Sequence, residues 1–323
     1  MVRPMGLLIL AILLGVMPAV AQTHARTTIN TTTAGQAGKR ILQFPASIAI
    51  GKVYALKKGW KYSDVRCEEK LVGPAVGALS VNTDQPLMLR LGYELAEHPE
   101  LLSKVTPDAF VKVDSDNMEV EDSICKPISK LVSIIELGLK DSEITDKGVE
   151  QLAALPNIRA LYIARINIRG SCLHALKGTK SLRSLALNNN AISPDKFKYF
   201  AELPALTKLW VEECGLNDEA LKYIGQIKSL EGLALDKNAK LTNEGLKNLR
   251  ELKHLHSLSI SEGKLTVQGV EQLKGLPLTH LWVPKYLQNA SARLQATFPH
   301  VKITFSSEGE VTPDEKKLCA PLK

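Results

Sequence analysis

Two tryptophans and a tyrosine are the residues of this chain best suited to binding chemistry. Trp210 and Trp282 are two of its three tryptophans. Like Tyr162, they offer a large surface, few rotatable bonds and one polar atom each. Such side chains dominate binding hot spots. We therefore predict that these three rings anchor a protein or glycan ligand. Four polar side chains are predicted to complete the contact: Asn188, Glu212, Asp236 and His280.

Catalytic chemistry has no recognisable arrangement in the sequence. The motifs G-x-S-x-G, H-E-x-x-H and G-x-x-x-x-G-K-[ST] do not occur, so nucleophile, zinc and phosphate-loop sites are unsupported. The acidic run at 114–117 (DSDN) is similar to the start of a calcium loop. However, Met118, Glu119 and Cys125 stand where an oxygen ligand, the glycine and the closing glutamate belong. We interpret the run as a solvated turn, and we predict a protein that is not an enzyme and holds no cofactor.

Histidines are concentrated between residues 254 and 300, at His254, His256, His280 and His300. A zinc site needs three or four converging ligands with supporting groups around them. His280 is one position out of phase with His256, so the pattern does not bring these rings together. We predict solvated or edge-packed histidines and no metal site.

The five cysteines have separate interpretations. Cys214 and Cys172 fall at inward positions of a repeat and are predicted to be buried thiols. Cys67 and Cys125 are a candidate disulfide, which would close a loop of 58 residues (125 minus 67) and stabilise the fold by about 4 kcal/mol in the chain-entropy description. The alternative is that both remain reduced. Cys319 is either free or paired in a C-terminal cap.

A repeat of about 24 residues must position these side chains. The pattern L-x-x-L-x-L begins at Ile134, Ile158, Leu182, Leu206, Leu230, Leu255 and Leu278. Successive differences are 24, 24, 24, 24, 25 and 23. One such unit cannot bury its own apolar face, so a fixed period in the twenties predicts a solenoid of stacked coils. Each coil is expected to supply one short strand.

Helix signals follow each strand at the same phase. Residues suited to helix N-caps recur at Thr145, Ser193, Asn217, Thr242 and Thr266. Apolar residues then recur every third position, as in Leu221, Ile224 and Ile227, which predicts a helix with one inward stripe. A small residue is favoured in the first helical turn, at Gly148, Cys172, Ala220, Gly245 and Gly269.

These runs, with Asn190, Cys214 or Asn238 after the strand, resemble the leucine-rich repeat family in its variant with helices on the convex face. The resemblance covers residues 128–306 and implies an α/β solenoid, a horseshoe with a parallel β-ladder and outer helices. It implies no single function, since family members bind very different partners. The phrases IGKVY at 50–54 and GALSV at 77–81 are similar to a β region ahead of the repeats in secreted planctomycete-type members.

Strand alternation places the binding residues on one surface. The residue between the last two leucines of each pattern faces away from the helices. That column contains Gly138, Tyr162, Ala186, Trp210, Ala234, Ser259, Trp282 and Thr304. The next column on the same face contains Asn188, Glu212 and Asp236. The alternative to ligand binding is that the rings fill space over neighbouring Ala and Ser.

The segments flanking the repeats predict an exported protein. Residues 1–22 have the charge, the apolar run and the Ala19-Val20-Ala21 site of a secretory signal, and an uncleaved anchor helix is the alternative. Residues 23–39 are predicted to be a flexible leader, 40–127 a small β-rich domain and 307–323 a polar tail. We expect a secreted, periplasmic or cell-envelope protein with no membrane span after cleavage.

Charge and composition narrow the classes of partner. The chain has 323 residues, with 41 basic and 34 acidic side chains and no arginine-rich run, so nucleic acid is not an expected partner. The leading hypothesis is an exported module that binds a protein or glycan through its concave sheet face. The alternatives are an envelope structural or adhesive component that self-associates, and an exported enzyme inhibitor or effector.

Overall fold

The computed structural model describes residues 38–62, 69–115 and 118–306. Its strands are β1 (Lys39–Gln43), β2 (Gly51–Ala55), β3 (Lys70–Pro74), β4 (Ala78–Asn82), β5 (Leu87–Leu91), β6 (Lys112–Ser115), β7 (Glu136–Lys140), β8 (Ala160–Ala164), β9 (Ser184–Ala186), β10 (Lys208–Trp210), β11 (Gly232–Ala234), β12 (Ser257–Ser259), β13 (His280–Pro284) and β14 (Lys302–Ser306). Its α-helices are α1 (Glu94–Glu97), α2 (Cys125–Ile128), α3 (Asp146–Leu152), α4 (Leu173–Leu176), α5 (Asp218–Ile224), α6 (Asn243–Leu246), α7 (Val267–Glu271) and α8 (Ser291–Thr297). Its 3-10 helices are η1 (Pro99–Lys104), η2 (Asp122–Ile124), η3 (Pro194–Glu202), η4 (Lys247–Glu251) and η5 (Lys285–Ala290).

A parallel ladder is the main feature of this part of the chain. In the described residues, twelve strands form one sheet in the order β14 to β5, then β2 and β3. Strands β5 to β14 are parallel to their neighbours, whereas β2 pairs with β3 and β5 in antiparallel fashion. The repeat leucines lie in register, as in Leu209 against Leu185 and Leu233.

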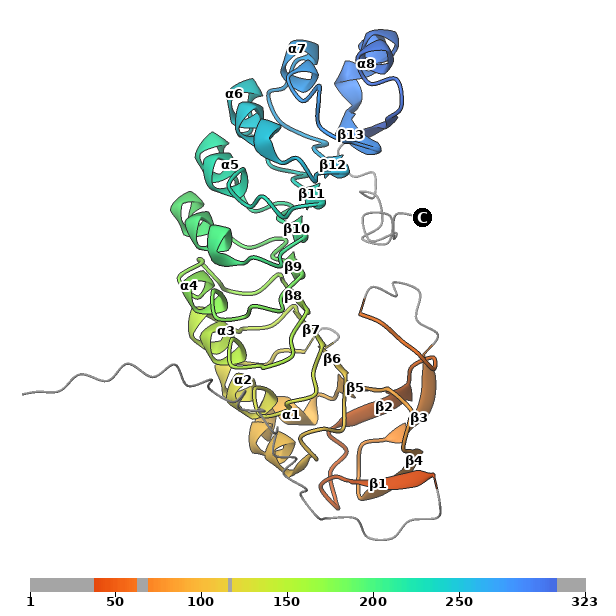
Figure 1. Cartoon of the computed structure of the whole chain (residues 1–323). Helices are drawn as coiled ribbons and strands as arrows, with labels where there is room; N and C mark the ends of the chain where they lie inside the picture. Colours follow the sequence, from red (N-terminus) through yellow and green to blue (C-terminus); the bar gives the residue numbers. More distant parts are fainter. Residues whose placement is uncertain (1–37, 63–68, 116–117, 307–323) are drawn as a thin grey trace, which may run out of the picture. The chain divides into compact units, whose positions relative to one another are not determined.

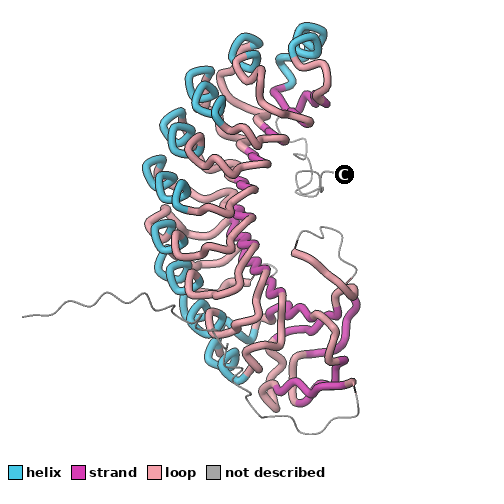
Figure 2. Tube along the Cα trace, in the orientation of Figure 1, coloured by secondary structure: helices cyan, strands magenta, loops and turns pink. Residues whose placement is uncertain are grey.

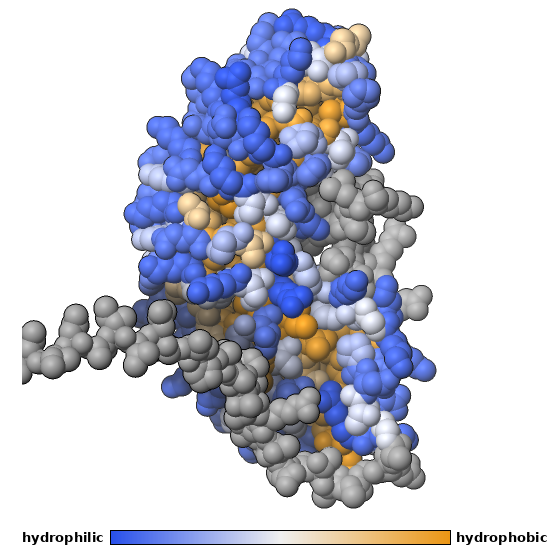
Figure 3. Space-filling model, viewed as in Figure 1, coloured by the Kyte–Doolittle hydropathy of each residue, from blue (hydrophilic) through white to orange (hydrophobic). Residues whose placement is uncertain are grey.

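The helices lie on one side of this ladder (Figures 1 and 2), and the repeat leucines are buried with the helix residues in one core. Leu209, Leu233 and Leu258 are at most 1% exposed and belong to one continuous core with the helix residues. In the view of Figure 3, hydrophilic side chains dominate over the helices, and hydrophobic residues show in patches between them. The predicted α/β solenoid is confirmed.

The N-terminal strands continue the ladder. Strand β6 pairs with β7, the first predicted repeat strand, and β5 pairs with β6. Strands β1 and β4 form a separate antiparallel pair, so a small N-terminal β sheet is present, whereas β2, β3, β5 and β6 of the predicted β-rich region 40–127 belong to the main sheet. The boundary near residue 127 stays a prediction. No helix in the described ranges is both long and apolar enough to cross a membrane. The predicted signal, leader and tail lie outside the described residues.

A buried asparagine joins the loops of neighbouring coils. Asn238 is completely buried, and its Oδ1 accepts hydrogen bonds from the amides of Cys214 (3.1 Å) and Leu216 (2.9 Å). Its Nδ2 donates to the carbonyl oxygens of Val211 (2.8 Å) and Leu235 (2.9 Å). These loop groups have no partner in a strand, so the asparagine satisfies them.

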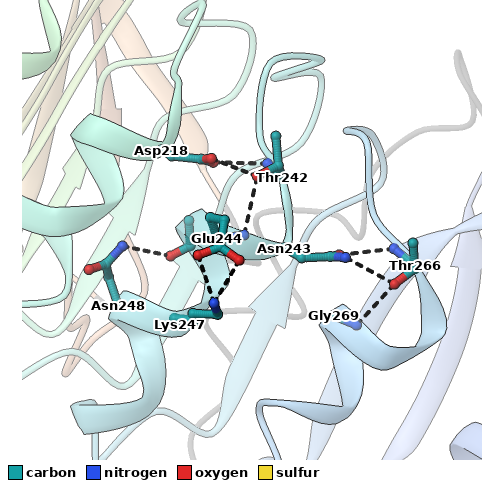
Figure 4. Close-up of polar contacts among 9 residues, drawn as sticks. Asp218, Thr242, Asn243, Glu244, Lys247, Asn248, Thr266 and Gly269 are labelled. Carbon is teal, nitrogen blue, oxygen red and sulfur yellow. Dashed lines mark hydrogen bonds and ion pairs between the residues drawn. The ribbon is translucent and has the colours of Figure 1, made fainter.

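A second polar ladder runs along the helix N-termini (Figure 4). Thr242 caps α6 by accepting from the amide of Glu244 (3.2 Å), and the carboxylate of Asp218 accepts from the amide (2.9 Å) and hydroxyl (2.6 Å) of Thr242. Asn243 repeats this contact on Thr266 of the next coil.

This ladder explains the column of small residues in the first helical turn. A Cβ atom at Gly245 would overlap the Asp218 carboxylate, and one at Gly269 would overlap the Asn243 side chain. The position must therefore stay small so that the side chain from the preceding coil can reach the next cap.

Four of the five predicted N-caps are confirmed by a side-chain hydrogen bond: Thr145, Asn217, Thr242 and Thr266. The prediction for Ser193 is wrong, since its side chain makes no capping hydrogen bond. The amide of Lys196 donates instead to the backbone oxygen of Ser193 (3.0 Å), as a 3-10 turn requires.

A left-handed residue ends each of five successive strands or the turns after them. Asp141, Arg165, Asn189, Glu213 and Lys237 have φ between 52° and 58°. None is glycine, although this conformation disfavours side chains. Arg165 pairs with Asp141, and Lys237 pairs with Glu213 at 3.4 Å, so two pairs of neighbouring corners carry opposite charges.

Candidate functional site

The predicted alignment of one residue per strand in a column across the sheet is confirmed, whereas ligand binding by these residues stays a prediction. Register places Gly138, Tyr162, Ala186, Trp210, Ala234, Ser259, Trp282 and Thr304 side by side. These side chains alternate with the leucines that face the helices, so they lie on the other side of the sheet. We call this side, within the described residues, the open face.

The aromatic rings lie on a floor of small residues. Trp210 and Trp282 form one apolar cluster with Ala186, Ala234 and the partly buried Tyr162. The ring centroids of Tyr162 and Trp210 are 6.2 Å apart. The two tryptophans are only 2% and 5% exposed, and the sequence did not predict this burial. The rings therefore pack over the neighbouring alanines, which is the role that the sequence offered as the alternative to ligand binding.

His280 adds a fourth ring to the cluster. It precedes Trp282 by two residues in β13, so both point to the open face, and their rings stack with centroids 5.6 Å apart and planes at 15°. The Thr279 hydroxyl lies 3.0 Å from its Nδ1. Partial burial, with a smaller effect of Lys302, lowers the pKa of His280. The ring is therefore mostly neutral at pH 7, which suits stacking and hydrogen bonding.

Asn188 and Glu212 are neighbours on adjacent coils. The Asn188 Oδ1 accepts from the Glu212 amide at 3.1 Å, so part of the predicted polar contact is used within the ladder. Both side chains are half-buried, as are Tyr162 and His280. These four are the predicted site residues that solvent reaches.

Asp236 is the most unusual of the predicted site residues because it is completely buried. Its Oδ1 accepts from the Ser261 amide at 2.6 Å, and the Ser259 and Ser261 side chains act on the carboxyl as hydrogen-bonding neighbours. The Trp210 Nε1 on the same face is buried without a partner. A buried polar atom left unsatisfied costs about 1–3 kcal/mol.

Burial also raises the pKa of Asp236, against the lowering effect of neighbouring Ser259 and Ser261. The folded protein therefore holds this proton more tightly than the unfolded chain, whose aspartates have the usual value of 3.8. The contribution of this group to the free energy of unfolding is therefore complete below pH 3.8. It declines as the pH rises towards the pKa of Asp236 in the folded protein.

Asp236→Asn should accordingly gain stability relative to the unchanged protein as pH rises above 3.8. Asparagine stays neutral and keeps the oxygen that accepts from Ser261. Urea unfolding of both proteins across a pH series measures the difference. Asp141→Asn is the control with the opposite sign, because the hydrogen bond from Arg165 lowers the pKa of Asp141. A difference for Asp236→Asn that does not change with pH would contradict the assignment.

The sequence missed a group of charged residues at the N-terminal end of the open face. Lys112 of β6 lies 3.0 Å from the Glu136 carboxylate of β7, and Arg90 of β5 lies 2.9 Å from Glu69. The Arg90 guanidinium also lies 4.7 Å from the centre of the Tyr54 ring. These strands lack the leucine pattern, and only the alternation of apolar residues at 87–91 could have indicated that they extend the ladder.

The interpretation of residues 114–117 as a solvated turn is wrong for its first half. Asp114 and Ser115 belong to β6, and Ser115 is completely buried and accepts from the Lys140 amide at 3.3 Å. The parallel pairing with β7 outweighs the turn preference of the acidic residues. Residues 116 and 117 lie outside the described part.

The cysteines of the described part are buried thiols. Cys125, Cys172 and Cys214 are free, and burial raises the pKa of Cys125 and of Cys214 to about 12. Such thiols are unreactive. Cys67, the candidate partner of Cys125, and Cys319 lie outside the described residues, and because Cys125 is a free thiol the candidate bridge is not formed in this structure. Within the described ranges, no three His, Cys, Asp or Glu side chains converge as a metal site would require.

Comparison with known proteins gave similarity to solved structures alone. No protein-family model and no curated protein matches the chain. Among solved structures, it is similar to the internalin InlF of Listeria monocytogenes, at 18% identity over 61% of this chain and 58% of that one, with a TM-score of 0.42. Internalin C2 of the same species gives 18% identity over 66% and 92%, with a TM-score of 0.47. A leucine-rich repeat protein of Leptospira interrogans gives 23% identity over 61% and 55%, with a TM-score of 0.44. The chain thus spans little more than half of two of these proteins.

Proposed function

We propose that this chain, a leucine-rich repeat protein by its 24-residue period and its parallel ladder, is an exported module that binds a protein partner on its open face. The observation that carries the proposal is the aromatic cluster of Trp210, Trp282 and the half-buried Tyr162 on this face, in which the Trp210 Nε1 has no hydrogen-bond partner. A partner strand or loop lying on this face supplies an acceptor for that indole.

The half-buried residues are the ones that a partner would touch first. Tyr162 and His280 lie at opposite ends of the tryptophan cluster, so a ligand covering it contacts both. Asn188 and Glu212 lie beside them on the same face. Because the ladder is rigid before binding, little conformational entropy is lost on association. Trp210 and Trp282 then act as the floor of the site, and their loss would affect both packing and binding.

Capture from a secreted or envelope fraction tests the proposal. The double variant Tyr162→Ala/His280→Ala should bind the captured protein about tenfold or more weakly, since each hot-spot truncation costs more than about 1 kcal/mol. The control Tyr199→Ala/His174→Ala removes the same residue types from a ring pair, centroids 6.1 Å apart, on the helix side. Equal capture by both double variants would sink the open-face proposal. Capture of a glycan instead would change the proposed class of ligand, but the open face would remain the proposed binding surface.

Self-association is the second candidate function, and one feature favours it. Strand β3 lies at the edge of the sheet and exposes Leu71 (54%) and Val72 (37%). An exposed apolar edge strand can pair with another chain. Sedimentation of the pure protein at several concentrations separates the two functions, because a mass that stays monomeric removes the second. The role of an exported inhibitor or effector would be one form of the first.

A further inference from the structure

We propose that a second site, at the rim of the ladder between the coils of β11 and β14, binds a neutral sugar ring. A pocket with a volume of about 390 Å³ opens there, beyond the carboxyl ends of the strands, and its lining includes Ala239, Glu262, Lys285 and Tyr286. Small-molecule sites commonly have volumes of about 300–1,000 Å³. The inference goes beyond the proposed function and does not rest on it, because it concerns another part of the molecule and another class of ligand.

The pocket lies where three successive coils depart from the repeat. Asn238 and the next core residue, Leu241, are separated by two residues, whereas the preceding coils have one residue in that place, so this loop contains an insertion at or beside Ala239. In the next coil a glycine, Gly263, stands at the inward position with a φ of 129°. In the coil after that, β13 is followed at once by the 3-10 helix η5. Each departure contributes a lining residue, namely Ala239, Gly263 and Tyr286, so the pocket is specific to this end of the rim.

Tyr286 supplies an aromatic wall that is fixed before any ligand arrives. Its hydroxyl donates to the Gly263 carbonyl oxygen at 2.7 Å and accepts from the Leu265 amide at 3.1 Å. These two bonds engage only the hydroxyl, whereas the residue as a whole is 57% exposed and lines the pocket. A large ring held in place at the surface can contact a ligand without losing further conformational freedom. The hydrogen bonds account for the hydroxyl, and the exposed ring is the part that indicates a ligand.

The charges of the lining favour a neutral ligand rather than an ion. Glu262 and Lys285 carry opposite charges, so an ionic ligand of either sign would meet one like charge. A neutral sugar can donate a hydroxyl hydrogen to the carboxylate and accept from the ammonium group. One face of a pyranose consists of C–H groups, which suit the negatively polarised face of the Tyr286 ring. The pocket therefore offers an apolar wall and hydroxyl partners of both kinds, as a sugar ring requires.

Saturation-transfer NMR of the full chain tests the inference, with glucose, galactose, mannose and N-acetylglucosamine as the probes. We expect at least one of them to bind with a dissociation constant on the order of 1 mM, since a ligand of this size forms few contacts. The protons of its C–H face should receive the most saturation, because that face lies on the Tyr286 ring. Methyl glycosides of the same sugar distinguish the source of the ligand. Unchanged binding assigns the end of a glycan chain, and lost binding assigns a free sugar.

Substitutions in the lining locate the sugar. Ala239→Trp places a large ring in the pocket from an exposed position and should weaken binding about tenfold or more. Ala201→Trp is the matched control, because it makes the same substitution at an exposed position of η3, and it should leave binding unchanged. Tyr286→Phe keeps the ring face and removes the hydroxyl that holds it, so it should bind more tightly than Tyr286→Ala, which loses both. Circular dichroism confirms that the ladder is folded in each variant.

Several outcomes would overturn the inference. Binding of none of these sugars would do so, as would equal binding by Ala239→Trp and the unchanged protein. Equal binding by Tyr286→Phe and Tyr286→Ala would assign Tyr286 to holding the corner alone and would remove the aromatic wall. Binding confined to the anion glucuronate would assign an ionic ligand in place of a neutral ring.

The result is independent of the capture experiment, since it requires no protein partner. Tyr162→Ala/His280→Ala should bind the sugar as the unchanged protein does, because neither residue lines the pocket. Loss of sugar binding in that variant but not in Ala239→Trp would place the sugar on the open face and overturn the rim site. If the sugar binds at the rim but no protein is captured, this inference holds and the proposed function fails.

Discussion

Asn238→Ala is expected to lower the free energy of unfolding by about 4 kcal/mol, because it strands two buried amides at about 1–3 kcal/mol each and empties a packed position. The amides of Cys214 and Leu216 lose their acceptor, and the carbonyl of Val211 in the same coil loses a donor. Alanine offers no polar atom in return at this completely buried position.

Urea unfolding followed by circular dichroism measures this loss. Asn248→Ala is the matched control, because it makes the same substitution in the same coil. Asn248 is half-buried and donates one side-chain hydrogen bond, to the Gly245 carbonyl at 3.1 Å, so its loss should cost about 1 kcal/mol or less. Similar losses at the two positions would mean that the inward asparagine does not join the coils as described.

Gly225→Ala is expected to cost about 3 kcal/mol through overpacking. Gly225 follows α5 as its C-cap, and an added Cβ would overlap the carbonyl oxygen of Asn248 in the next coil. It would also come within 3.1 Å of the Leu221 oxygen. Both neighbours are backbone atoms, so no side chain can rotate away, and the two coils must separate.

Gly178→Ala is the control for this substitution. Gly178 also follows a short helix, but the nearest atom to its added Cβ is the Ala175 oxygen at an ordinary 3.6 Å. The control should leave stability unchanged or raise it slightly, because alanine restricts the unfolded chain. Thermal unfolding of the two variants side by side decides the question. Equal melting temperatures would show that coil spacing at Gly225 is not set by this contact.

The sequence predicted the ladder well because strand pairing and leucine spacing obey the same period. A step of 24 residues brings each leucine of one coil beside its equivalent in the next, as Leu185 and Leu209 show. It also predicted which residues share the open face, since alternation along a strand is a local property. Helix caps such as Thr242 were predictable for the same local reason.

Contacts that cross between coils were less predictable. The carboxylate of Asp218 accepts hydrogen bonds from Thr242 in the next coil, and no pattern within one coil indicates that contact. Strands β5 and β6 join the ladder although they lack the leucine pattern. In β6, Val113 is the apolar residue that aligns with the repeat leucine Leu137. The burial of Trp210 depends on the sizes of the side chains beside it on neighbouring coils, such as Tyr162 and Ala234, and the repeat period does not specify those sizes.

The left-handed corners of the ladder have a consequence for how such a protein can change. Each corner from Asp141 to Lys237 has a non-glycine residue in the left-handed conformation. Glycine would adopt this conformation with less strain, and the strain destabilises the fold by about 1–3 kcal/mol per corner. Four of the five side chains at these corners are charged, two of each sign, and Asn189 between them is neutral. The rim is therefore a surface on which the sequence can diverge in charge while the backbone path stays constant, and related chains could acquire different electrostatic identities there without refolding.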